Sequence, residues 1–199
     1  EMARTASSGT LYPIFLKLRN RRALVVGGGP MAAIRAKQLL SAGASVTVIA
    51  PRLCTAMQRL TGSPSIRVLN RRYKPGDVSR GYFIVVGATN DTPTQAALAQ
   101  EAKKAGTLYN VVDAPRHCNY FTPAVVERGP LQVAICSGGQ SPVLSGRLRR
   151  ILDAALPQST GDWTALLGAL RDQLKKAIPS NMERRRVLIN QFIEQVTSK

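Results

Sequence analysis

The sequence predicts an α/β fold: a doubly wound parallel sheet, then a small antiparallel segment, then a C-terminal helical part. Three observations predict it. Short apolar runs alternate with helical stretches as far as residue 115. Two apolar runs then follow each other with no helix between them. From residue 141 onward the chain shows only helical patterns.

Apolar segments in the first part are typical of parallel strands, because they are short, rich in β-branched residues and separated by helical stretches. They cover residues 22–27, 45–50, 66–70, 82–89 and 107–113. The spacing of apolar residues predicts a helix over 30–42. The alanine-rich stretch 92–105 predicts a second helix, with Thr92 as its N-cap and Pro93 at its first position.

The second part of the chain is expected to be a hairpin followed by helices. The run YFTPAVVERGPLQVAICSGG holds two apolar stretches separated by ERGP, which favours an antiparallel pair. Helices are predicted over 141–156, 160–177 and 181–197, and Ser141 is the expected N-cap of the first.

Composition limits the function without selecting it. The 199 residues include 28 Lys and Arg against 11 Asp and Glu, a formal net charge of +17. Such a field attracts a nucleic acid or a polyanionic small molecule, or it is only a solvated surface. Cys54, Cys118 and Cys136 lack metal-ligand spacing and favour reduced thiols in a cytoplasm. No apolar run is long enough for a membrane span, and we expect neither membrane nor metal binding.

Three small residues form the spacing G-x-G-x-x-A between a predicted strand and a predicted helix: Gly27, Gly29 and Ala32. In Rossmann-type sheets the first permits a tight turn, the second lets a diphosphate approach the backbone, and the third lets the helix pack on the sheet. Free N–H groups and the helix dipole then hold the phosphates. The alternative is a glycine turn needed only for packing.

We therefore predict a dinucleotide site at this turn. Its predicted residues follow the first and second strands and are Gly27, Gly28, Gly29, Pro30, Met31, Pro51 and Arg52. NAD-binding sheets usually carry an acidic residue after the second strand, but this chain has Pro51 and Arg52 there. Arg52 could favour the 2′-phosphate of NADP. The alternative is an exposed loop arginine, with backbone groups holding the ribose.

Several segments occur in the order YPIFLKLRNRRALVVGGG, GATND, NVVDAP, FTPAVVERGPLQVAICSGGQSPVLSGRLRR and ERRR. In that order they resemble the precorrin-2 dehydrogenase/sirohydrochlorin ferrochelatase family, the dehydrogenase–chelatase module of siroheme synthase. The resemblance runs from about Tyr12 through Leu156, and more weakly through the helical tail. The chain ends where a bifunctional siroheme synthase would continue into its methyltransferase half, so we expect the stand-alone form.

The resemblance implies NAD-dependent oxidation of precorrin-2 to sirohydrochlorin and, in many members, insertion of Fe²⁺ to give siroheme. It also implies an intertwined homodimer. Four segments are then expected: a disordered arm or cloning remnant at 1–10, an NAD-binding Rossmann domain at 11–115, a dimerisation segment at 116–150 and a helical domain at 151–199. The positive charge suits this assignment, because the substrate is an octacarboxylate macrocycle.

The resemblance implies NAD as the cofactor, with Thr89 and Asn90, after the fourth predicted strand, at the nicotinamide pocket. It places the family's catalytic aspartate at Asp113, where the fifth predicted strand ends. A carboxylate there can accept a proton as a hydride leaves the macrocycle; the alternative is an aspartate that caps the following turn. Substrate-binding residues are expected in the second glycine turn and the helix after it, at Ser137, Gly138, Gly139, Arg147 and Arg150. The single histidine, His117, is interpreted as a solvent-exposed loop residue.

Two other functions stay open at this point. One is a non-catalytic NAD-binding regulator, since similar sheets serve as ligand sensors. The other is a nucleic-acid-binding protein, which the charge alone suggests. The sequence has no recognisable reading motif and only 5% aromatic residues, so we expect no specific nucleic acid partner.

Overall fold

The computed structural model describes residues 11–197. They form two compact units, which divide between Thr122 and Pro123. The arm expected at residues 1–10 lies outside the described residues.

The first unit is built on a sheet of five parallel strands in the order β3-β2-β1-β4-β5. The strands are β1 (Arg22–Val26), β2 (Ser45–Ile49), β3 (Ile66–Leu69), β4 (Ile84–Gly87) and β5 (Leu108–Val111). Leu24 and Val25, in the central strand β1, and Val85, in its neighbour β4, have no exposed surface. These strands are covered on both faces, which is why they read as apolar runs. The predicted doubly wound sheet is confirmed.

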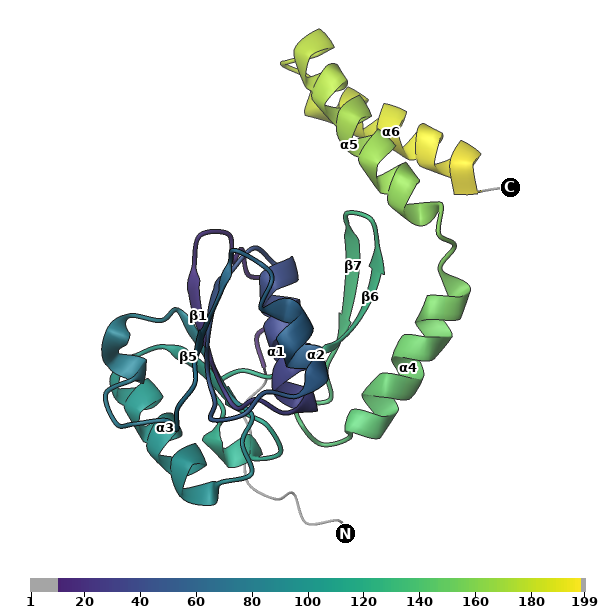
Figure 1. Cartoon of the computed structure of the whole chain (residues 1–199). Helices are drawn as coiled ribbons and strands as arrows, with labels where there is room; N and C mark the ends of the chain where they lie inside the picture. Colours follow the sequence, from purple (N-terminus) through teal and green to yellow (C-terminus); the bar gives the residue numbers. More distant parts are fainter. Residues whose placement is uncertain (1–10, 198–199) are drawn as a thin grey trace. The chain divides into compact units, whose positions relative to one another are not determined.

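Helices cover both faces of this sheet (Figure 1). Helices α1 (Pro30–Ser41) and α2 (Thr55–Leu60) pack on one face, where Met57 completes a core with residues of β1 and β2. Helix α3 (Thr92–Lys104) packs on the other face through Leu98. The sequence analysis missed α2, because six residues are too few to show a helical period. Short 3₁₀ turns add η1 (Val78–Arg80) and η2 (Pro115–His117).

Some local expectations were wrong. The N-cap of α3 is Asp91 and not Thr92, so Pro93 is the second residue of the helix and not the first. The Asp91 carboxylate accepts the N–H of Thr94 at 3.1 Å. The fourth strand begins at Ile84 and not at residue 82. The carbonyl groups just before it, of Tyr82 and Phe83, accept the hydroxyl of Thr107 at 2.7 and 2.9 Å.

Residues 112–122 belong to the first unit because they return along β5. The side-chain oxygen of Asn119 accepts the N–H of Tyr109 in β5 at 2.7 Å, and its amide group donates to the carbonyl of Thr107 at 2.9 Å. The side chain of Asn110, also in β5, donates to the carbonyl of Tyr120 at 3.0 Å. The returning segment covers the outer edge of the sheet, which would otherwise be open to pairing. The division of the remaining chain into segments 116–150 and 151–199 stays a prediction.

The second unit is the predicted hairpin followed by the three predicted helices. Strands β6 (Ala124–Arg128) and β7 (Leu131–Ile135) are antiparallel. The helices are α4 (Pro142–Ala155), α5 (Thr160–Ala177) and α6 (Met182–Thr197). Ser141 caps α4 as predicted, because its hydroxyl oxygen accepts the N–H of Leu144 at 3.2 Å.

Arg128 ties the hairpin to the end of α4. Its guanidinium is buried, donates to the carbonyl of Leu156 at 3.0 Å and pairs with the carboxylate of Asp153 at 2.9 Å. A buried arginine with its donors satisfied holds two elements in one relative position.

A second arginine cluster fixes the loop after β3. Asp77 is 3% exposed and accepts two hydrogen bonds from the guanidinium of Arg71, both at 2.7 Å. It also accepts the N–H of Lys74 at 2.9 Å. The hydrogen bonds from Arg71 hold the pKa of Asp77 below its usual value.

Replacing Asp77 by asparagine is expected to lower the free energy of unfolding at pH 7 by about 2 kcal/mol, because it removes one partner of a hydrogen-bonded charge pair. Since the folded pKa is lowered, the contribution is present above about pH 4 and is lost as the pH falls through the folded value. Urea unfolding of both proteins at pH 7 and at low pH measures this. Asp172→Asn is the control, because its pair with Arg171 is exposed. Equal losses in the two variants would contradict the assignment.

Candidate functional site

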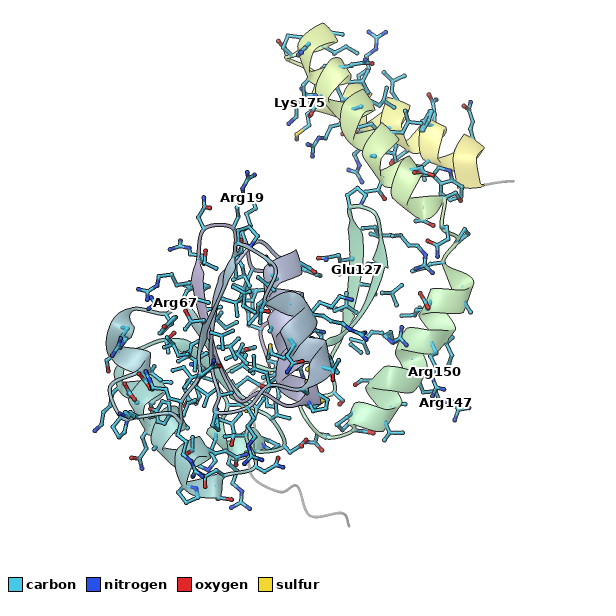
Figure 2. All side chains as sticks on the ribbon, in the orientation of Figure 1. Arg19, Arg67, Glu127, Arg147, Arg150 and Lys175 are labelled. Atoms are coloured by element: carbon cyan, nitrogen blue, oxygen red, sulfur yellow. The ribbon has the colours of Figure 1, made fainter. Side chains whose placement is uncertain are left out.

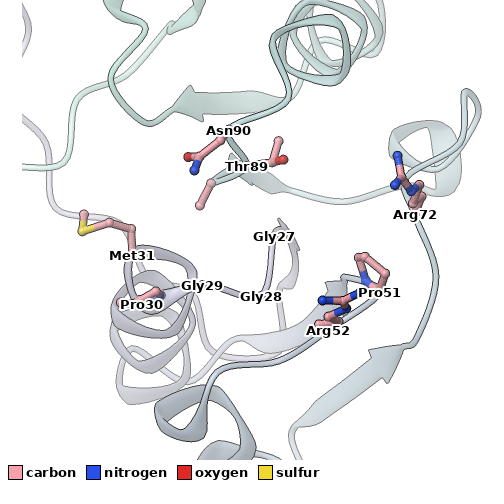
Figure 3. Close-up of a pocket in the computed structure, with 11 residues that line it drawn as sticks. Gly27, Gly28, Gly29, Pro30, Met31, Pro51, Arg52, Arg72, Thr89 and Asn90 are labelled. Carbon is pink, nitrogen blue, oxygen red and sulfur yellow. The ribbon is translucent and has the colours of Figure 1, made fainter.

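A cavity of about 610 Å³ lies at the carboxyl ends of β1, β2 and β4 (Figure 3). The strand order reverses between β1 and β4, and open α/β sheets bind ligands at such a switch point. The residues around the cavity are Gly27, Gly28, Gly29, Pro30, Met31, Pro51, Arg52, Arg72, Ala88, Thr89 and Asn90. All the residues predicted for the cofactor are among them. Arg72 and Ala88 were missed.

The three glycines differ in what surrounds them. Gly27 has φ +131°, and a Cβ there would lie 2.1 Å from the carbonyl oxygen of Ala88. A Cβ on Gly28 would lie 1.9 Å from the carbonyl oxygen of Arg52. A Cβ on Gly29 would meet none of the described atoms within 4 Å. Gly27 and Gly28 are therefore required by the fold, whereas Gly29 borders open space.

The start of α1 offers hydrogen-bond donors to that space. Within residues 11–197 the N–H groups of Gly28, Gly29 and Met31 have no acceptor, and Pro30 has no N–H. Gly29 is the N-cap and provides no side-chain cap. Unpaired donors at the positive end of a helix suit an anion. Ala32 is fully buried against the sheet, as the third position of the fingerprint requires. The backbone here fits a dinucleotide diphosphate.

The pocket has two chemically different ends. Figure 3 shows Met31 and Asn90 at one side, and Pro51, Arg52 and Arg72 at the other. In sheets of this type the adenosine ribose lies at the end of the second strand, which here is the side of Arg52. The nicotinamide would then lie toward Met31 and Asn90.

Asp113 follows β5 at the same edge of the sheet but does not line the cavity. It is one of the few non-glycine residues with positive φ (+61°), in a turn closed by the N–H of Ala114 and the carbonyl of Val111 at 3.2 Å. Its side chain is exposed, and no hydrogen bond to its carboxylate occurs among the described atoms. The turn is therefore closed by backbone, and the carboxylate is available to a ligand.

Arg35 is a half-buried residue of α1. It lies one helical turn after Met31 on α1. Burial lowers the pKa of Arg35, and the charges of Tyr120 and Asp113 oppose that effect. Asp113 therefore acts electrostatically on a half-buried residue of α1.

Two other residues of the loop after β5, Cys118 and His117, were considered in the sequence analysis. The Sγ of Cys118 lies 3.3 Å from the N–H of Val111 and 3.3 Å from the carbonyl of Ala114. Burial raises its pKa, so it is a packing thiol and not an activated one. His117 is exposed in η2.

The predicted substrate residues lie in the second unit. The hydroxyl oxygen of Ser137 accepts the N–H of Ser141 at 3.0 Å, and Gly138 and Gly139 form the turn between them. Arg147 and Arg150 are exposed, and Figure 2 shows both side chains extending outward from α4. Their contact with substrate stays a prediction.

Two further properties concern the part of the chain described. No group of three His, Cys, Asp or Glu side chains there is placed to hold a metal ion. None of its helices has the length and hydropathy of a membrane span.

The parallel sheet, the glycine turn and the donor-rich helix start define a dinucleotide-binding protein of the Rossmann type. Comparison with known families agrees. Residues 14–124 match the family described as putative NAD(P)-binding, and residues 128–155 match the sirohaem biosynthesis protein central family.

Individual similar proteins define the family more narrowly than these two general matches. The chain is 41% identical to siroheme synthase 3 of Aeromonas hydrophila over 174 residues, which are 87% of this chain and 37% of that protein. It is 42% identical to siroheme synthase 1 of Yersinia enterocolitica over 180 residues, 90% of this chain and 38% of that one. The solved structure of SirC, precorrin-2 dehydrogenase, has a TM-score of 0.76 and 31% identity, covering 92% of this chain and 89% of that one.

The chain therefore belongs to the precorrin-2 dehydrogenase family, as its motifs predicted. The prediction of an NAD-type cofactor is confirmed with it. The chain spans less than two fifths of the length of these two siroheme synthases. The stand-alone form stays a prediction.

Replacing Gly29 by leucine is expected to leave the fold intact and to abolish measurable NAD⁺ binding, because the new side chain enters space that the diphosphate needs. Isothermal titration with NAD⁺ and thermal melting measure the two effects. Gly62→Leu is the control, since a Cβ on Gly62 also meets no described atom within 4 Å and Gly62 is not in the pocket. Unchanged NAD⁺ affinity in the Gly29 variant would rule out this position for the diphosphate.

Proposed function

We propose that this chain oxidises precorrin-2 to sirohydrochlorin with NAD⁺. The observation that carries the proposal is the placement of Asp113 at the same sheet edge as a pocket formed by the dinucleotide fingerprint. The family membership and the similarity to SirC, precorrin-2 dehydrogenase, support it.

When bound, NAD⁺ supplies a hydride acceptor. The chain itself binds and orients this cofactor. The N–H groups of Gly28, Gly29 and Met31 face the diphosphate, and the close approach of the loop after β2 confines the adenosine end. Asn90, at the other end, has a side chain without a partner among the described residues and can bond the carboxamide of the nicotinamide.

Asp113 accepts the proton that the substrate releases. Oxidation of precorrin-2 removes one hydride, which goes to the cofactor, and one proton. A single proton acceptor is therefore enough for this reaction. The Asp113 carboxylate has no described hydrogen-bond donor that would compete for it. Its unusual backbone conformation is typical of residues held in place at functional sites.

The substrate's charge explains the basic character of the chain. An octacarboxylate is drawn by a protein of net charge +17. Arg147 and Arg150 on α4 are exposed cations that can bind carboxylates bidentately, and the Ser137 turn offers a hydroxyl nearby in the same unit. The cysteines, all free in the structure, support a reducing cytoplasm as the compartment.

Iron enters this proposal as a substrate of a second reaction. Insertion of Fe²⁺ into sirohydrochlorin releases two pyrrole protons. We assign Asp113 as the carboxylate that accepts them one at a time, and its exposed side chain passes the first to water before it accepts the second. The loss of the sirohydrochlorin absorbance on adding Fe²⁺ and the purified protein tests this step. Conversion no faster than without protein would limit the chain to the dehydrogenation.

Replacing Asp113 by asparagine is expected to lower the rate of sirohydrochlorin formation by about 10²- to 10⁴-fold, because the proton acceptor is lost. NAD⁺ affinity should stay unchanged, since Asp113 does not line the cavity. Absorbance at the sirohydrochlorin and NADH bands gives the rate. Asp91→Asn is the control: it neutralises a carboxylate at the same edge, and asparagine is also a good N-cap.

Two outcomes would count against the proposal. A wild-type rate in the Asp113 variant removes this residue from the mechanism. NAD⁺ binding by the wild type with no turnover of precorrin-2 favours the non-catalytic regulator.

We also propose that two copies of the chain associate through the second unit. Leu144, Leu148 and Ile151 form a stripe along α4 at helical spacing, and their exposed fractions are 51%, 40% and 54%. The second unit buries few side chains of its own, so such a stripe needs a partner surface. The intertwined homodimer implied by the family resemblance supplies one.

Replacing Leu148 by glutamate is expected to shift the protein from dimer to monomer, because a charge would have to be buried in an apolar interface. Analytical ultracentrifugation measures the mass. Gln100→Glu adds the same charge on an exposed position of α3 and should stay dimeric. A monomeric wild type, or a dimeric Leu148 variant, would contradict the assignment of this stripe.

A further inference from the structure

We propose that a pocket between α5 and α6 is a docking site for an acidic peptide segment of another protein, which inserts one apolar side chain between cationic residues. This α5–α6 pocket has a volume of about 260 Å³ and lies wholly within the second unit. The proposed oxidation of precorrin-2 does not use it. The inference is therefore independent of that function.

The α5–α6 pocket forms where two consecutive helices pack together. Residues 178–181 connect α5 to α6, and so short a connection places the two helices antiparallel and side by side (Figure 1). The side-chain oxygen of Asn181 caps α6, because it accepts the N–H of Arg184 at 2.9 Å. The chain itself thus caps the start of α6, and the attraction of the pocket for anions comes from side chains.

Four cationic side chains line the pocket. Arg171 and Lys175 are four residues apart, so they share one face of α5. Arg185 and Arg186 lie on the facing helix α6. Among the described residues that line the pocket there is no Asp and no Glu. Cations from both helices therefore surround one small space.

Most of these cations have no carboxylate partner. Within residues 11–197, Lys175, Arg185 and Arg186 form no ion pair. Arg171 pairs with its neighbour Asp172 at 3.4 Å, but both side chains are largely exposed, and such a pair contributes little. Side chains of one sign that converge on a pocket give it a positive potential, which attracts carboxylates.

The interior of the pocket is apolar. Met182 and Ile189 are seven residues apart, two helical turns, and line it from the same face of α6. Met182 is 77% exposed, so nothing among the described residues covers it. Long cationic side chains lay their aliphatic stems on such a surface and keep their charges at its rim. An apolar interior with a cationic rim fits an apolar side chain that is flanked by carboxylates.

The size and lining of the pocket favour this occupant over others. Its volume lies below the range of about 300–1,000 Å³ that is typical of small-molecule sites, so it suits a single large side chain better than a macrocycle. Single-stranded nucleic acids stack on aromatic side chains, and no described Phe, Tyr or Trp lines this pocket. A DNA duplex would leave the apolar interior unfilled. A second copy of the chain, with a net charge of +17, offers little acidic surface.

The test uses a short fluorescein-labelled peptide in which glutamate and aspartate residues surround one central phenylalanine. The aromatic ring can fill the interior, next to the cations and the sulfur of Met182. Fluorescence anisotropy with the full chain at low ionic strength is expected to give a Kd of about 10 μM. The same peptide with alanine in place of phenylalanine should bind at least about tenfold more weakly, because the buried apolar contact is lost.

Two charge variants compare the rim with a distant surface. Lys175→Gln combined with Arg186→Gln is expected to weaken peptide binding by about tenfold, because it removes two cations of the rim. Lys103→Gln combined with Lys104→Gln is the matched control. It removes two exposed cations of α3, outside the pocket, and should change the affinity by less than about twofold.

A second pair of variants tests the apolar interior without changing the charge. Met182→Gln is expected to weaken peptide binding by about threefold to tenfold, because it makes the pocket surface polar. Val187→Gln changes another exposed apolar residue of the same helix that does not line the pocket, and it should leave the affinity unchanged. Circular dichroism and thermal melting check that each variant is folded.

Several results would overturn the inference: no binding at about 1 mM peptide, equal binding of the phenylalanine and alanine peptides, or equal losses in the two charge variants. Displacement of the labelled peptide by duplex DNA or by sirohydrochlorin more strongly than by unlabelled peptide, at equal negative charge, would assign the pocket to that polyanion instead. A chain that oxidises precorrin-2 but does not bind the peptide refutes only this inference. A chain that binds the peptide but does not turn over precorrin-2 refutes only the proposed function.

Discussion

The close approach of three backbone segments at the end of β1 is the constraint on which the first unit depends. The carbonyl oxygens of Ala88 and Arg52 occupy the places where side chains of Gly27 and Gly28 would begin, at 2.1 and 1.9 Å. Only glycine permits this contact. Because the loops after β2 and β4 are both held against the glycine turn, the pocket has walls on either side. Gly29, one residue later, is left bordering open space.

Hydrogen bonds and ion pairs determine which charged side chains near this pocket remain available to a ligand. The acidic residues of the loops are engaged: Asp77 with Arg71, and Asp91 with the start of α3. Asp113 is the carboxylate at this edge that accepts no described hydrogen bond. Arg52 and Arg72, which line the pocket, have no ion pair within residues 11–197. The proposed function uses both features: the arginines for an anionic ligand and the Asp113 carboxylate as the proton acceptor.

The second unit is well connected by hydrogen bonds but leaves much of its apolar surface exposed. Its buried arginine, Arg128, is satisfied by hydrogen bonds and an ion pair to the end of α4. Many of its apolar side chains remain exposed, and the stripe of Leu144, Leu148 and Ile151 is about half exposed. A hairpin with three helices has too little enclosed volume to bury such a stripe by itself. The unit has local order from hydrogen bonds, and it needs further apolar contact for the rest of its stability.

The sequence by itself determined the strands, every helix but α2, the hairpin, the Ser141 cap, the family and the pocket residues other than Arg72 and Ala88. Apolar periods, caps and the glycine spacing are local patterns, which a sequence shows directly. Tertiary structure decided the rest. It brought Arg72 beside Arg52 through the Arg71–Asp77 contact, and it joined residues 112–122 to the first unit through pairing along β5. These placements depend on hydrogen bonds between segments distant along the chain, and such bonds leave no periodic signal in the sequence.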